Sequence, residues 1–189
     1  ENDSIAFEDF GKNGDYGTQK ALRGATTASG EGFVLNFTTT VEEGKAAGGI
    51  YLKTGENTYS LFINKTTAGN LQIQIQAWEN GKWDMYNFDT TISLIADGEV
   101  TVKLICKYGF NSNDKIKRFG LVLTSGGKSV EYKLYNAWQG TTNKSGVVPS
   151  VLYGTNGYQT YQFGLVARKS TKATFSNVSY VLGNPEANT

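Results

Sequence analysis

The segment from Leu71 to Phe88 constrains the fold of this chain most strongly, because it contains two strand patterns and the turn between them. In LQIQIQAW, apolar residues alternate with three glutamines and a tryptophan, which is the two-residue period of a strand with one apolar and one polar face. The Asn80-Gly81 pair that follows is a strong hairpin signal, since a type I′ turn needs positive φ at both central positions. The sequence therefore predicts a tight antiparallel hairpin.

A two-residue turn also fixes the register of this hairpin. The predicted cross-strand pairs are Glu79–Lys82, Trp78–Trp83, Gln76–Met85 and Gln74–Asn87. On the other face, Asp84, Tyr86 and Phe88 join Ala77, Ile75 and Ile73. One face is thus predicted to carry glutamines, an asparagine, a methionine and two paired indoles.

That polar face has the chemistry that a sugar needs. Flat aromatic rings cover the apolar C–H face of a pyranose, and neutral amides both donate hydrogen bonds to its hydroxyls and accept them. The alternative is a Trp78–Trp83 pair that only stabilises the hairpin, by less than about 1 kcal/mol, or that packs under a neighbouring loop. The sequence leaves both interpretations open. The ligand-binding residues predicted on this hairpin are Trp78, Trp83, Gln74, Gln76 and Asn87.

Strand patterns recur through the rest of the chain, and no stretch shows a sustained helical period. They lie near residues 4–10, 32–40, 49–53, 58–64, 71–78, 82–88, 99–108, 117–124, 129–137, 161–168 and 173–182. Eleven short strands need two packed sheets or a barrel to bury their apolar faces, so we expect an all-β, two-sheet antiparallel sandwich. A chain of 189 residues with 39% hydrophobic content fits a single domain, predicted over residues 1–183 with a tail at 184–189.

Charge and composition exclude several classes of function. A net charge of +1 with 19% charged residues leaves no basic stripe for nucleic acid, and no apolar run is long enough to span a bilayer. The single cysteine, Cys106, excludes an internal disulfide and is expected to be buried. The chain has no histidine, which removes the commonest general base and zinc ligand.

No catalytic constellation is predicted. Retaining glycoside hydrolysis needs two carboxyl groups about 5 to 5.5 Å apart, whereas the acidic residues here are scattered along the chain. Asp84 and Glu131 each stand alone in the sequence pattern. A calcium site that uses Asp3, Glu8 or Asp9 with backbone carbonyls stays an open alternative to the absence of any cofactor.

A second candidate region is the long stretch between 139 and 160, which has no strong strand pattern. A loop of this length in a compact domain usually has a function. Trp138, Tyr153 and Tyr158 lie in or beside it and could wall a binding cleft. The alternative is an added edge strand over 147–152, with the tyrosines covering the end of the sandwich.

Three segments of the chain are distinctive: FEDF near Phe7, the middle stretch GGIYLKTGENTYSLFIN, and the closing FGLVARKSTKATFSNVSYVL. They resemble the concanavalin A-like lectin and glucanase superfamily, in particular the laminin-G-like and carbohydrate-binding modules of secreted bacterial proteins. The resemblance implies a jelly roll whose first strand pairs with its last and whose concave face or rim loops hold a glycan. The E-x-D-x-x-E strand of the glucanase branch has no match here, so catalysis is not implied.

The expected function is therefore a non-catalytic carbohydrate-binding module. We expect it to be extracellular or attached to a bacterial cell surface, and to belong to a larger multidomain protein, with no nucleic acid partner and no membrane insertion. The alternatives are a protein-interaction, adhesion or spacer domain, and a glycoside hydrolase or lyase that uses Asp84 or Glu131 with a tyrosine.

Overall fold

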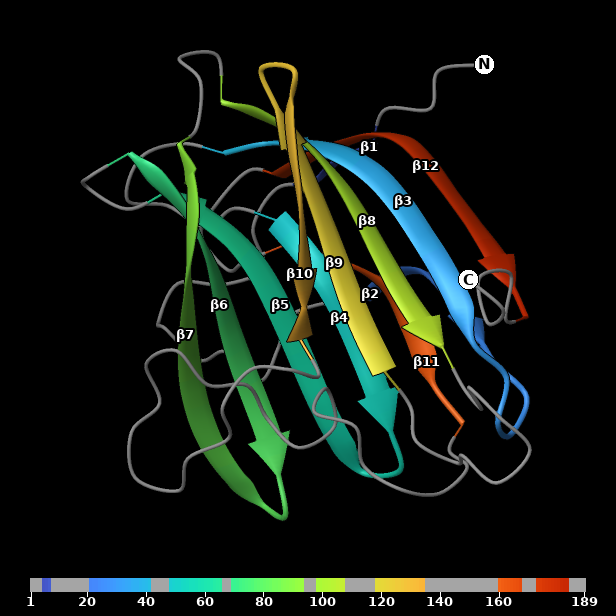
Figure 1. Ribbon diagram of the computed structural model, residues 1–189. Helices are drawn as coiled ribbons and strands as arrows, with labels where there is room; N and C mark the ends of the chain where they lie inside the picture. Colours follow the sequence, from blue (N-terminus) through green and yellow to red (C-terminus); the bar gives the residue numbers. More distant parts are fainter. Residues whose placement is uncertain are drawn as a thin grey trace.

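The structure is a computed structural model of the chain, and it describes residues 5–7, 21–41, 48–65, 69–93, 98–107, 118–134, 160–167 and 173–183. For 5–7, 21–24, 88–93, 118 and 133, the backbone alone is described. Within these ranges the fold is an all-β sandwich of two antiparallel sheets (Figure 1). The predicted fold class is confirmed.

In the described part of the chain, each sheet has six strands. Sheet 1 has the order β1 (Ile5–Phe7), β12 (Ala173–Leu182), β3 (Phe33–Thr40), β8 (Glu99–Lys107), β9 (Arg118–Ser125) and β10 (Lys128–Lys133). Sheet 2 has the order β2 (Ala21–Thr26), β11 (Gln162–Ala167), β4 (Gly48–Thr54), β5 (Asn57–Lys65), β6 (Asn70–Glu79) and β7 (Lys82–Ser93). The first strand pairs with the last in antiparallel fashion, as the family resemblance implied.

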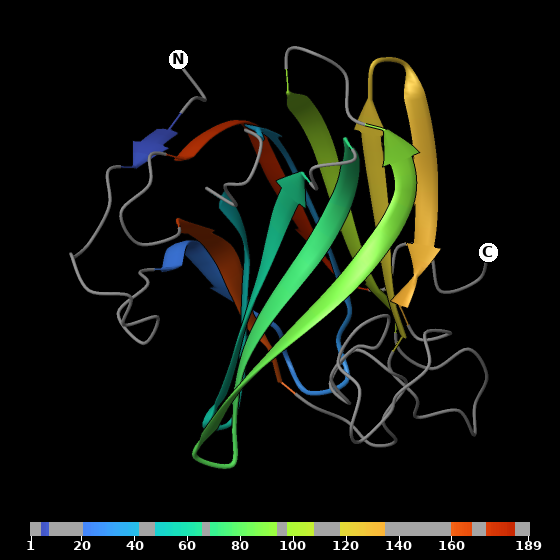
Figure 2. The same ribbon diagram turned by 90° about the vertical axis from the view of Figure 1, so that its left-hand side faces the viewer.

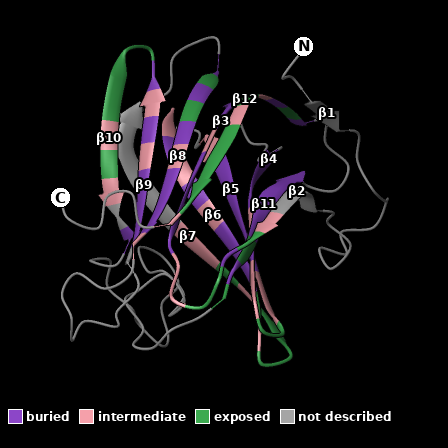
Figure 3. Ribbon diagram, turned by 90° about the vertical axis from the view of Figure 1, so that its right-hand side faces the viewer, coloured by how far each residue is buried: buried purple, intermediate pink, exposed green. Residues whose placement is uncertain are grey.

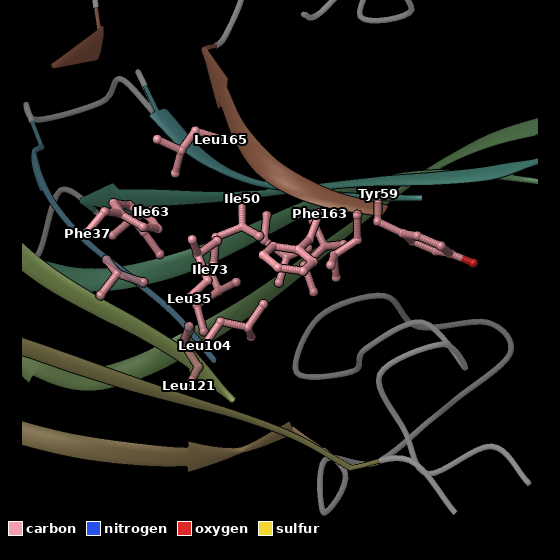
Figure 4. Packing of buried hydrophobic residues seen from close by; sticks show 14 of the residues in the cluster. Leu35, Phe37, Ile50, Tyr59, Ile63, Ile73, Leu104, Leu121, Phe163 and Leu165 are labelled. Carbon is pink, nitrogen blue, oxygen red and sulfur yellow. The ribbon is translucent and has the colours of Figure 1, made fainter. Parts of the chain in front are cut away.

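The hydrophobic core lies between the two sheets. Phe33 of β3 stacks on Phe163 of β11, with ring centroids 4.0 Å apart and planes only 3° from parallel, so this contact joins the sheets directly. Aliphatic side chains from both sheets gather near Phe163 (Figure 4). Cys106 is fully buried in this core, as predicted. Figure 3 shows buried residues along the inner strands of both sheets.

The register of the β6–β7 hairpin matches the prediction residue by residue. Trp78 pairs with Trp83 and Glu79 with Lys82, and the pairing continues inward along both strands. Asn80 has φ of 53° and Gly81 has φ of 76°, the two positive values that a type I′ turn requires. Local sequence signals were therefore sufficient to place this element.

Two strands differ from the prediction. β2 was not predicted, because ALRGAT lacks a regular alternation and contains a glycine; it is defined by its pairing to β11, where the register shifts between Phe163 and Leu165. β7 extends to Ser93, and so it absorbs a segment whose secondary structure the sequence left open. In both cases, pairing with a neighbouring strand outweighs a weak local preference.

Candidate functional site

The β6–β7 turn lies at one end of the molecule, beyond the ends of β8, β9 and β10 (Figures 1 and 2). It is held against the neighbouring turn of the same sheet, because the backbone N–H of Asn80 donates to Oδ1 of Asn57 at 3.2 Å. The two central residues of the turn, Asn80 and Gly81, are both exposed. The tip of the hairpin is thus anchored in the sheet while its polar face stays open to solvent.

Two indoles form the end of this face. The ring centroids of Trp78 and Trp83 are 5.6 Å apart and their planes meet at 66°, an edge-to-face arrangement. Trp78 is 36% exposed and Trp83 is 41% exposed, so both side chains present part of their surface to solvent. At this angle the two rings form a corner, not the flat floor that two coplanar indoles would make.

Neutral polar side chains continue this face toward the middle of sheet 2. The strand pairing aligns the outward residues of β5 with those of β6 and β7. We define the amide–indole face as the outward side chains of Thr58, Ser60, Asn64, Gln72, Gln74, Gln76, Trp78, Trp83, Met85 and Asn87. Met85, at 49% exposed, is the most open apolar side chain of this set.

The middle of the face is closed to solvent. Gln76 is only 3% exposed and Ser60 is 8% exposed, although both point away from the core between the sheets. Beside them, Phe62 and Val166 form a separate buried cluster against which Tyr51 packs. The sequence pattern predicts direct ligand contact for Gln76, but at 3% exposed this side chain offers almost no surface to a ligand. Phe62 and Tyr51 were missed, because one strand cannot show what its neighbours on β4 and β11 contribute.

A second group of polar residues lies on the opposite side of the hairpin tip. The hydroxyl of Tyr59 donates a hydrogen bond to the carboxylate of Glu79, and Asp84 and Tyr86 lie close enough to interact electrostatically with that carboxylate. Tyr59 lies at one end of the core cluster, with its hydroxyl oxygen directed away from the other labelled side chains (Figure 4). Asp84, isolated in the sequence pattern, thus shares this face with Glu79.

The pKa values of this group are perturbed upward. Burial raises the pKa of Glu79 above its usual range, the charge of Asp84 adds to the rise, and the Tyr59 hydrogen bond opposes it. Burial also raises the pKa of Tyr59, with the negative charge of Glu79 as a further cause. The protonated form of Glu79 is therefore favoured more in the fold than in the unfolded chain.

Several predicted residues lie outside the described part of the chain. They are Trp138, Tyr153 and Tyr158 of the candidate loop, and Asp3, Glu8 and Asp9 of the calcium alternative. Glu131 lies exposed on β10 of sheet 1, on the other sheet from Asp84. Among the described residues, no group of three or more His, Cys, Asp or Glu could hold a metal ion. The described part also contains no helix long and apolar enough to cross a membrane.

Comparison with known proteins gives similarities to solved structures alone. No protein-family model matches the chain, and no curated protein matches it. It is similar to the GH43 protein BlXynB from Bacillus licheniformis, with TM-score 0.43 and 12% identity over 80% of this chain. This chain spans only 27% of that protein.

Two further solved structures have a similar arrangement. One is the native heptameric SAP-like pentraxin from Limulus polyphemus, with TM-score 0.41, 8% identity, and coverage of 95% of this chain and 76% of that one. The other is the CBM2 module of the evolved Dit of Lactobacillus casei BL23 phage J-1, with TM-score 0.38, 9% identity, and coverage of 97% and 69%. At these TM-scores and identities, the similarities support no conclusion about what this chain binds.

Proposed function

We propose that this chain is a non-catalytic glycan-binding module whose ligand packs into the corner formed by Trp78 and Trp83. The observation that carries the proposal is the exposure of both indoles, 36% and 41%, at the edge of a face built from neutral amides. A sugar ring presents an apolar C–H surface to an indole and hydroxyls to amides, so this one face offers both kinds of contact.

Exposed Met85 and half-buried Gln74 and Asn87 extend this contact. Met85 supplies a flexible apolar surface next to Trp83, and Gln74 and Asn87 face each other two positions further inward. Gln76, paired with Met85 between them and the indoles, is buried. We expect a Kd between micromolar and millimolar, because ordering costs consume much of the interaction energy of a small interface. The proposal includes an extracellular or cell-surface location and a place within a larger multidomain protein.

The test is a binding assay with single tryptophan variants. Trp78→Ala and Trp83→Ala should each weaken glycan binding at least about tenfold, while the Tm falls by only a few degrees. The assay is affinity electrophoresis against plant, microbial and host polysaccharides, in parallel with and without calcium. Thermal unfolding by circular dichroism reports whether each variant is folded.

Tyr180→Ala is the matched control. Tyr180 is 49% exposed and makes an edge-to-face contact with Phe163 at 5.6 Å, so its exposure and ring packing resemble those of the indoles, but it belongs to sheet 1. It should lose some stability and no binding. A folded wild-type chain that binds no glycan, or tryptophan variants that unfold, would contradict the proposal.

A protein-binding function is the second candidate, and a different observation favours it. Tyr180, Val181 and Leu182 of β12 are 49%, 53% and 41% exposed, and β1 pairs only with Ala173–Phe175 of that strand. Exposed apolar side chains on an uncharged sheet edge are suited to contact with another protein. If Val181→Lys abolishes binding to a partner protein while glycans fail to bind, this function replaces the first.

Catalysis is the third candidate, favoured by the two carboxylates and two tyrosines beside the hairpin tip. Incubation with each polysaccharide that binds, followed by measurement of new reducing ends and of unsaturated products, tests it directly. Release of either product by the wild-type chain, and its loss in Glu79→Gln, would assign an enzyme activity to this group.

A further inference from the structure

The inner part of the amide–indole face contains buried hydrogen-bond acceptors that lack donors. Asn64 donates from Nδ2 to Oε1 of Gln72 at 3.3 Å, but its own Oδ1 is buried and accepts no hydrogen bond. Oδ1 of Asn87, across from Gln74, is in the same state. A buried carbonyl without a donor destabilises the fold, so such groups in a native structure call for a missing partner.

The missing partner must bring hydrogens. A sugar hydroxyl donates and accepts, whereas a carboxylate or sulfate oxygen only accepts and leaves both asparagine oxygens unsatisfied. Rotation of the Asn87 amide about its last side-chain bond turns either the oxygen or the NH₂ group outward, and the oxygen has no hydrogen bond to lose. The free protein is thus prepared to meet hydroxyls of either orientation.

The charge of the surrounding face supports the same conclusion. Among the described outward side chains of β4, β5, β6, β7 and β11, Lys53 is the one charged group. It lies on β4, two strands away from Trp78, with Thr58 between them. An anionic sugar placed over Gln74 and Asn87 would lose hydration without gaining a cation beside it, which is unfavourable.

The length of the polar stretch indicates a chain of sugars. From Trp78 to Gln72 along β6 are six residues, or about 20 Å of strand. The indole corner is at one end, Asn64 lies beside Gln72 at the other end, and Asn87 lies opposite Gln74 between them. We infer that the ligand is an uncharged polysaccharide that runs beside β6, with several linked rings that pass over Met85, Gln74 and Asn87 between the indole corner and Asn64. This inference rests on the proposed glycan-binding function.

The test compares polysaccharides in neutral and anionic pairs that share sugar configuration: hydroxyethyl cellulose with carboxymethyl cellulose, galactan with polygalacturonate, and mannan with polymannuronate. Affinity electrophoresis of the full chain is run in low salt and in 0.5 M NaCl, an ionic strength at which surface charge interactions are screened beyond roughly 5 Å. We expect one neutral member to bind, with a Kd that changes less than twofold with salt.

Two variants separate the contributions of hydrogen bonding and charge. Asn87→Ala should weaken binding of the neutral chain about three- to tenfold, while the Tm stays the same or rises, because the free protein loses an unsatisfied acceptor. Lys53→Gln is the matched control on the same face, and it should change neither binding nor Tm. Binding should also strengthen from disaccharide to tetrasaccharide.

The results distinguish failure of the uncharged-ligand inference from failure of the proposed glycan-binding function. Preference for an anionic member, lost in 0.5 M NaCl and in Lys53→Gln but dependent on Trp83, would overturn the uncharged ligand and leave glycan binding in place. An Asn87→Ala variant that binds normally but has a lower Tm would overturn the role of the asparagines. A folded chain that binds neither member of any pair would overturn the proposed function itself.

Discussion

At the scale of single residues, the hairpin tip places different chemistry on its two sides. Trp78 and Trp83 face outward among neutral amides, and Glu79 lies on the opposite side with Tyr59 and Asp84. Because successive residues of a strand point to opposite faces, neighbours in sequence belong to separate surfaces. Changes to Glu79 should therefore alter stability without altering the indole corner.

Glu79 should make stability depend on pH. Its pKa is raised in the fold above its ordinary value of 4.5, so the fold binds this proton more tightly than the unfolded chain does. The stability that protonation contributes is fully present below that ordinary value and is lost as pH rises through the folded pKa. Glu79→Gln keeps a neutral group beside Tyr59 at every pH.

We therefore expect Glu79→Gln to raise the Tm at pH 7 by roughly 1–2 °C and to match the wild type near pH 4. The measurement is thermal unfolding of both proteins from pH 4 to pH 8, read as the difference between them so that other titrating groups cancel. If the Tm difference between the two proteins is the same at pH 4 and at pH 8, the raised pKa of Glu79 is contradicted.

At the scale of one element, the turn of the β6–β7 hairpin controls the position of the indoles. Gly81 has φ of 76°, and a Cβ added there would meet no atom within 4 Å. Any cost of Gly81→Ala therefore comes from backbone conformation alone, and we expect about 1–2 kcal/mol. The same change should loosen the Trp78–Trp83 pair, since both residues lie within three positions of the turn's second residue.

Gly55→Ala provides a matched control in the β4–β5 turn. Gly55 also has positive φ, 59°, and open space around it, but it lies outside the β6–β7 turn. Both variants should lose similar stability in chemical denaturation. Only Gly81→Ala should reduce the exciton circular dichroism of the two packed indoles and the glycan affinity. If both variants reduce these two quantities equally, the β6–β7 turn does not control the position of the indoles.

At the scale of the whole molecule, contacts between the sheets should dominate stability. Phe33 stacks on Phe163 at 4.0 Å and meets Phe119 edge-on at 6.2 Å, so it links strands of both sheets. Phe33→Ala should cost about 3–5 kcal/mol, a large part of the stability of a typical domain. Phe62→Ala, also fully buried but in the small outer cluster, should cost less.

Urea unfolding of the two phenylalanine variants checks this difference. Equal losses would mean that the outer cluster of Phe62, Val166 and Tyr51 is packed as tightly as the core between the sheets. The comparison also concerns function, because the outer cluster borders the amide–indole face through the pairing of Phe62 with Gln74.

Local sequence determined the β6–β7 hairpin and its polar face. The two-residue alternation and the Asn80-Gly81 turn act over a few residues. The hairpin register, and the face on which each side chain lies, could therefore be predicted without knowledge of any other strand. The same periodicity was enough to predict a sandwich, and the burial of Cys106 followed from its place in an apolar alternating run.

Tertiary structure alone decided which parts of that face are open. Gln76 and Phe62 are buried on the outward side of sheet 2, where β4, β5, β6 and β11 lie side by side, and the sequence of β6 alone does not reveal this. Tyr59 meets Glu79 because β5 pairs with β6. Alternation tells which face of a strand a residue occupies, whereas solvent exposure and pKa depend on neighbours that long-range pairing brings close.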